Sequence, residues 1–95
     1  QKATEDLGEM INQVKEIFSL SLQALKTGDT ELAKKVLAHD DIIDQMEINL
    51  RKAHVDRLHE GVCHGNAGAI YLDILSNLER IGDHSVNIAK YILEG

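Results

Sequence analysis

Acidic side chains are spaced as potential metal ligands in two parts of the sequence. The first group lies within residues 39–49, which contain no Lys or Arg, and its members are Asp40, Asp41, Asp44 and Glu47. The second group is Glu79 and Asp83, which have the same four-residue spacing as Asp40 and Asp44. In a helix, like charges four residues apart lie on one face and cost some tenths of a kcal/mol unless another group offsets them. Both groups therefore require an explanation.

The two groups are expected to face each other across a helical hairpin. Asp44 and Glu47 each follow an apolar seam residue, and Glu79 and Asp83 do the same on a later helix, so all four lie on matching flanks. Counting outward from a turn near residues 62–64 puts Asp44 level with Asp83 and Glu47 close to Glu79. Four carboxylates this close cannot all stay ionised in poorly hydrated surroundings without a cation.

Spacing alone leaves three outcomes open for this acidic strip. A divalent or trivalent metal ion could be held by oxygen ligands, with Asp40, Asp44, Glu79 and Asp83 as primary candidates and Asp41, Glu47 and His84 as secondary ones. Alternatively, Arg51, four residues after Glu47, and Arg80, adjacent to Glu79, could neutralise the acids. The third outcome is a strip that is simply solvated.

Three amphipathic helices must position these residues. Gly28 precedes two good N-caps, Asp29 and Thr30, and the glycine-rich residues 60–68 form a second break. The helices are predicted at about 4–26, 30–60 and 67–94. Short loops make neighbours antiparallel, so we expect an all-α, up-down-up antiparallel three-helix bundle forming a single domain over residues 1–95. The absence of proline and an aromatic content of 3% fit long helices.

Apolar residues at alternating spacings of three and four define one seam per helix. The first seam is Leu7, Ile11, Val14, Phe18, Ser21 and Leu25. The second is Leu32, Val36, His39, Ile43, Met46, Leu50 and Ala53. The third is Tyr71, Leu75, Leu78, Gly82, Ser85, Ala89 and Ile92, widened by Ile74, Ile81 and Ile88. The small residues of the third seam predict close helix packing, or room for a ligand.

Composition and missing motifs exclude several classes of function. The net charge of −6 argues against nucleic acid as a partner, and no apolar run reaches the ~20 residues of a membrane span. A single cysteine, Cys63, excludes a disulfide within the chain. His59, Cys63 and His64 match no standard zinc spacing. We find no nucleophile–base pair, no phosphate-cradling loop and no Glu-x-x-His motif, so no catalytic residues are assigned and no enzymatic activity is expected.

The string LERIGDH at residues 78–84, extended by Asn77 and by residues 87–89, closely resembles the third-helix motif of the phosphate-uptake regulator (PhoU) family. The resemblance implies a three-helix domain, of which full-length members carry two in tandem. It also implies an acidic E/D-x-x-x-D metal-binding element at Glu79 and Asp83, with Asp40 and Asp44 as its partner. The metal would be iron, zinc or manganese. A cluster that needs a second domain's carboxylates would be incomplete in one copy, or would be completed by a homodimer.

Residues 54–75 resemble more narrowly the PhoU-like tail of sodium/phosphate cotransporter-related membrane proteins. The chain begins with Gln1, and we expect a piece of a longer membrane protein, tethered on the cytoplasmic side without inserting itself into the bilayer. Its partner would be the transporter's own membrane domain or another phosphate-transport protein, and its role would be to regulate phosphate uptake. The alternative hypothesis is a structural or oligomerisation module with a solvated acidic face and no metal.

Overall fold

The computed structural model describes residues 2–61 and 65–95 and confirms the all-α bundle. Helix α1 runs from Lys2 to Thr27, α2 from Thr30 to His59, and α3 from Gly65 to Glu94. Each predicted boundary lies within two residues of the observed one. The described residues contain no strand.

The break between α1 and α2 is built by two adjacent residues. Gly28 adopts a φ of 69°, a left-handed conformation that favours glycine, and its N–H donates to the Ala24 carbonyl at 2.7 Å. Asp29 then caps α2, because its Oδ1 accepts from the N–H groups of Glu31 at 3.0 Å and Leu32 at 3.2 Å. The chain therefore reverses within two residues, which sets α1 and α2 antiparallel.

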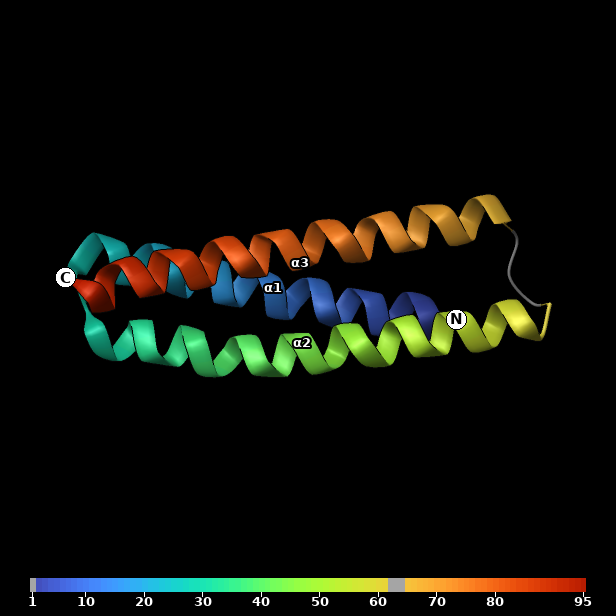
Figure 1. Cartoon of the computed structure of the whole chain (residues 1–95), viewed down its shortest axis with the longest axis horizontal. Helices are drawn as coiled ribbons and strands as arrows, with labels where there is room; N and C mark the ends of the chain where they lie inside the picture. Colours follow the sequence, from blue (N-terminus) through green and yellow to red (C-terminus); the bar gives the residue numbers. More distant parts are fainter. Residues whose placement is uncertain (1, 62–64) are drawn as a thin grey trace.

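The three helices lie side by side in an elongated bundle of 50 × 17 × 17 Å (Figure 1). Helices α1 and α3 run in the same direction and α2 runs in the opposite one, so the C-terminus lies at the end where α1 meets α2 (Figure 1). Each helix packs against both others. Every helix consequently buries two contacting flanks and exposes the remaining one. None of the described helices has an apolar stretch long enough to cross a bilayer.

The core runs along the bundle axis and consists of aliphatic side chains with small residues between them. Its buried apolar members are Met10, Val14, Ile17, Ala24, Ala33, Val36, Ile43, Leu50, Leu75, Leu78 and Ala89. Two buried serines satisfy their hydroxyls within their own helices. Ser21 donates to the Phe18 carbonyl at 2.7 Å and Ser85 donates to the Ile81 carbonyl at 2.9 Å. The predicted seams of α2 and α3 are largely confirmed.

The predicted seam of α1 is wrong in part. Phe18 and Leu25 are 38% and 46% exposed, whereas Met10, Ile17 and Ala24 are fully buried. The reason is that α1 carries apolar residues on two adjacent stripes, and contact with both α2 and α3 selects the stripe that contains Ser21 and Ala24. The other stripe stays at the surface.

Candidate functional site

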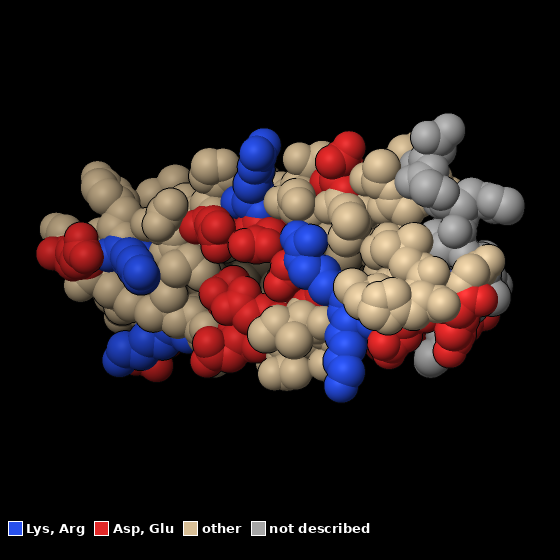
Figure 2. All heavy atoms as spheres, turned by 45° about the vertical axis from the view of Figure 1, so that its right-hand side comes forward, with Lys and Arg blue, Asp and Glu red and all other residues tan. Residues whose placement is uncertain are grey.

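The predicted acidic groups meet where α2 packs against α3. Asp40 of α2 lies against Gly82 of α3, since a Cβ placed on Gly82 would be 3.5 Å from Asp40 Oδ1. Asp40 therefore lies beside Gly82, where even an added methyl group would make only ordinary van der Waals contact with the carboxylate. Figure 2 shows acidic side chains gathered in the middle of one face of the molecule, with basic side chains beside them.

Asp40 has the most strongly perturbed carboxyl group of this cluster. Burial, followed by the negative charges of Asp44 and Asp83, raises the pKa of Asp40 from 3.8 to about 6. Asp44 is also close enough to accept a hydrogen bond from the protonated Asp40 carboxyl. We call Asp40, Asp44 and Asp83 the aspartate cluster; within it, burial and the two neighbouring charges disfavour the ionised form of Asp40.

Replacing Asp40 with Asn is expected to stabilise the fold by about 1 kcal/mol at pH 7, after allowance for solvent screening. The raised pKa means that the folded state binds the proton more tightly than the unfolded chain. The contribution of Asp40 to wild-type stability is therefore greatest below pH 3.8 and is lost as the pH rises through about 6. Urea unfolding at pH 7 and pH 4 measures the difference, which should shrink at the lower pH. An equal gain from exposed Asp56→Asn would show that only the overall charge matters.

A second cluster lies next along the α2–α3 contact and contains its own counter-ion. Arg51 is paired through Nε with Glu47 on its own helix. Its Nη2 lies 3.7 Å from Glu79 Oε2 and donates to Ser76 Oγ at 3.3 Å, both on α3. The guanidinium therefore bridges the two helices between two glutamates. We call these residues the arginine bridge.

The two glutamates of the arginine bridge interact directly as well. A hydrogen bond shared with Glu47 raises the pKa of Glu79 above its usual value, burial adds to the rise, and Arg51 opposes it. The Glu47 side chain is only 15% exposed. This part of the strip therefore depends on the positive charge of Arg51.

The structure brings most of the predicted ligands to the α2–α3 contact but divides them between the aspartate cluster and the arginine bridge. The expected closeness of Glu47 to Glu79 is confirmed, whereas Asp83 influences Asp40, one turn of α2 before the predicted Asp44. His84 lies apart from the acids, beside Leu25 and Tyr91 on the α1 side of α3. Among residues 2–61 and 65–95, no three His, Cys, Asp or Glu side chains are placed to share one metal ion as they stand.

The donor chemistry of the aspartate cluster nevertheless suits a hard cation. Asp40, Asp44 and Asp83 offer carboxylate oxygens. Burial and then repulsion raise the pKa of Asp40, and a nearby positive charge would favour its ionised form. The arginine bridge fits a metal less well, because the guanidinium already occupies that role. Of the three outcomes left open by spacing, an arginine counter-ion is observed for Glu47 and Glu79, because Arg51 pairs with both.

Sequence reasoning missed a buried aromatic cluster near the other end of the α2–α3 contact. His54 is 1% exposed and stacks on Tyr71 with ring centroids 5.0 Å apart, while the Arg57 guanidinium lies 5.4 Å from the centre of the same Tyr71 ring. Neither ring nitrogen of His54 has a hydrogen-bond partner in the described part of the chain. Burial, and then the charge of Arg57, lowers the pKa of His54. The three-residue spacing of His54 and Arg57, which puts both on one face of a helix, is a sequence signal that could have indicated this cluster.

The remaining histidine and cysteine residues form no site within the part of the chain that the structure describes. His39 is half-buried as expected for its seam, but its Nε2 has no partner among the described residues. His59 is exposed at the end of α2. Cys63 and His64 lie outside the described residues.

Three comparisons place the chain among known proteins. The model of the PhoU domain family matches residues 7–92. The chain is 30% identical over 92 residues to phosphate-specific transport system accessory protein PhoU homolog 1 of Thermotoga maritima, a match that covers 90% of this chain and 40% of that protein. The PhoU homolog of Aquifex aeolicus is 28% identical over 95 residues, covering 95% of this chain and 42% of that protein. The chain thus spans about two fifths of the length of these relatives. No solved structure gives a significant match.

Proposed function

The chain belongs to the PhoU domain family, and from that membership we propose that it is a regulatory accessory domain of phosphate transport. The observation that carries the proposal is the family match over residues 7–92, which takes in all three helices. It is supported by relatives named as accessory proteins of phosphate-specific transport systems. The domain acts by contact with a transport protein and not by catalysis.

The more specific part of the proposal concerns the setting. The domain belongs to a sodium/phosphate cotransporter-related protein, lies on the cytoplasmic side, and contacts either the membrane domain of its own chain or another phosphate-transport protein. The support is the resemblance of residues 54–75 to the tails of such proteins.

A metal ion bound at the acidic strip is the second specific part. Asp40, Asp44 and Asp83 are the residues that would hold it, and Glu79 would join them if Arg51 released it. Bound metal would supply the positive charge that the aspartate cluster lacks and would tie α2 to α3. The support is the position of Asp40 beside Gly82 of α3 and the effect of Asp44 and Asp83 on the Asp40 carboxyl.

The regulatory role is tested by measuring uptake of radiolabelled phosphate in cells that lack these residues. Deleting the coding region for residues 1–95 should change the response of the uptake rate to external phosphate by roughly fivefold or more, the lower end of typical allosteric coupling. The wild-type segment should restore the response. Unchanged uptake in the deletion strain would contradict the regulatory role.

The metal is tested separately with the purified chain, by elemental analysis and by thermal melts in Mn²⁺ and in EDTA. The wild type should melt at a higher temperature with Mn²⁺, and Asp40→Asn combined with Asp83→Asn should abolish that rise. Asp56→Asn combined with Asp73→Asn removes the same charge from exposed positions of α2 and α3 and should preserve it. A wild type that is indifferent to Mn²⁺ would favour the alternative, a structural module with a solvated acidic face.

A further inference from the structure

A shallow groove lies where α1 packs against α2. It has a volume of about 220 Å³, and the buried side chain of Leu50 forms part of its floor. The other lining residues are Asp6 and Glu9 of α1 and Met46 and Asn49 of α2. The groove therefore combines an apolar floor with a rim that is acidic on the α1 side.

The same chemistry continues along both helices beyond the groove. Glu16 follows Glu9 by seven residues on α1, and Ile42 precedes Asn49 by seven residues on α2. Because the two helices are antiparallel and rise equally per residue, Glu16 lies level with Ile42, about 10 Å along the bundle from Glu9. Ile42 is 54% exposed. We call the surface formed by Asp6, Glu9 and Glu16 of α1 and Ile42, Met46 and Asn49 of α2 the α1/α2 surface.

The negative charge of the α1/α2 surface is not neutralised from within the chain. Glu9 and Glu16 are exposed, and neither forms an ion pair with Lys or Arg among residues 2–61 and 65–95. The acidic strip at the α2–α3 contact differs, because Arg51 already lies between two of its glutamates. A metal ion does not fit Glu9 and Glu16, since carboxylates about 10 Å apart cannot both reach one ion at about 2.5 Å. Two separate cationic side chains fit them better.

The spacing of these two glutamates favours a helical partner. Residues seven apart in an α-helix lie on one face and are about 10.5 Å apart, which matches the separation of Glu9 and Glu16. Three residues of a β-strand also cover about 10 Å, but they place the first and last side chains on opposite faces. A helix with cationic side chains at positions i and i+7 can therefore meet both glutamates at once.

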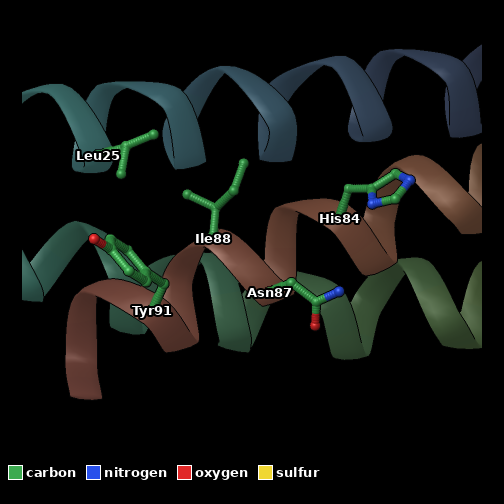
Figure 3. A pocket seen from close by; sticks show the side chains of 5 residues that line it. All are labelled: Leu25, His84, Asn87, Ile88 and Tyr91. Carbon is green, nitrogen blue, oxygen red and sulfur yellow. The ribbon is translucent and has the colours of Figure 1, made fainter. Parts of the chain in front are cut away.

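The groove between α1 and α3 provides an internal comparison. It is lined by Leu25 of α1 and by His84, Asn87, Ile88 and Tyr91 of α3 (Figure 3). None of these lining residues is acidic, so a basic helix would form no ion pair there. A partner chosen by charge should therefore prefer the α1/α2 surface.

We propose that the α1/α2 surface binds an amphipathic helix of another protein that carries Lys or Arg seven residues apart and apolar side chains between them. The two cations pair with Glu9 and Glu16, while the apolar side chains cover Ile42 and Met46, as in other helix-in-groove interfaces. The net charge of −6 attracts basic segments and repels acidic ones. Cytoplasmic segments of membrane proteins are rich in Lys and Arg, so a transport protein suits this chemistry, although that choice of partner rests on the function proposed above.

The test uses a fluorescently labelled helical peptide of about five turns, built from Ala and Gln with two lysines seven residues apart and leucines between them on the same face. A second peptide has the same composition, reordered so that lysines and leucines share no face. Fluorescence anisotropy should show at least tenfold tighter binding of the first peptide to the full chain, and added salt should weaken that binding. Amide shifts in the NMR spectrum should change along the α1/α2 surface and not at the groove of Figure 3.

Matched variants identify the side chains responsible. Glu9→Gln combined with Glu16→Gln should weaken binding about fivefold or more, as expected for the loss of two exposed ion pairs. Asp73→Asn combined with Glu94→Gln removes the same charge from exposed positions of α3 and should have little effect. Ile42→Ser should also weaken binding, whereas Ile48→Ser should not, although the two isoleucines are 54% and 55% exposed. Circular dichroism checks that each variant is folded.

Four results would overturn the proposal. They are a wild type that binds neither peptide at millimolar concentration, equal affinity for both peptides, equal weakening by the α3 control, and shift changes centred on the acidic strip or on the groove between α1 and α3. Each is independent of phosphate uptake. Failure of the peptide experiments would leave the deletion test of the regulatory role intact, and an unchanged uptake rate would leave the binding results intact.

Discussion

Arg51→Met is expected to destabilise the fold by about 2 kcal/mol at pH 7, between the values for exposed and fully buried ion pairs. Methionine keeps most of the side-chain packing but removes the guanidinium that bridges Glu47 on α2 and Glu79 on α3. The two carboxylates then face each other without a counter-ion, one of them largely buried. The melting temperature of a domain this size should fall by roughly 10 °C.

The cause of the loss can be separated from a general charge effect. Arg80→Met removes the same charge from an exposed position of α3 and should cost far less. Adding Glu47→Gln to Arg51→Met should restore most of the lost stability, because only one carboxylate then remains in the arginine bridge. The loss should also shrink near pH 4, because the raised pKa of Glu79 lets that carboxyl take up a proton there. If Arg51→Met and Arg80→Met have the same melting temperature, the arginine bridge makes no specific contribution to stability.

His54→Phe is expected to stabilise the fold by about 1–2 kcal/mol at neutral pH, since it replaces a buried group whose polar atoms are unpaired with an apolar ring of similar shape. Phenylalanine retains the stacking on Tyr71, and neither nitrogen of His54 has a partner in the described residues. The gain should grow in acid. The lowered pKa of His54 means that the unfolded chain takes up the proton first, so this residue's contribution is complete above pH 6.5 and is lost as the pH falls below it.

Urea unfolding of wild type and His54→Phe at pH 7.5 and pH 5.5 measures both effects. Exposed His59→Phe is the control and should leave the pH dependence as it is in the wild type. Asp40 acts in the opposite direction, since its raised pKa makes the wild type more stable as the pH falls from 6 toward 3.8. Asp40→Asn should therefore steepen the acid loss that His54→Phe removes. A His54→Phe protein that loses stability in acid as fast as wild type would show that His54 is not the titrating group.

The sequence by itself determined the architecture, because each element depends on local signals. Helix periodicity, the left-handed position at Gly28 and the N-cap at Asp29 act within a few residues, and they fixed the helix boundaries to within two residues. The same local reasoning found both acidic groups, since their four-residue spacing is a property of one helix at a time. It also named Arg51 as a candidate counter-ion.

Only the tertiary structure decided how those residues are used. The buried stripe of α1 depends on its simultaneous contact with α2 and α3, which periodicity along one helix cannot show, and so Phe18 and Leu25 were assigned to the core although they are exposed. The bridge from Arg51 to Glu79, the approach of Asp40 to Gly82 and the stacking of His54 on Tyr71 each join α2 to α3. Such contacts depend on the relative register and rotation of two helices, and a shift of one turn in either would bring different side chains together.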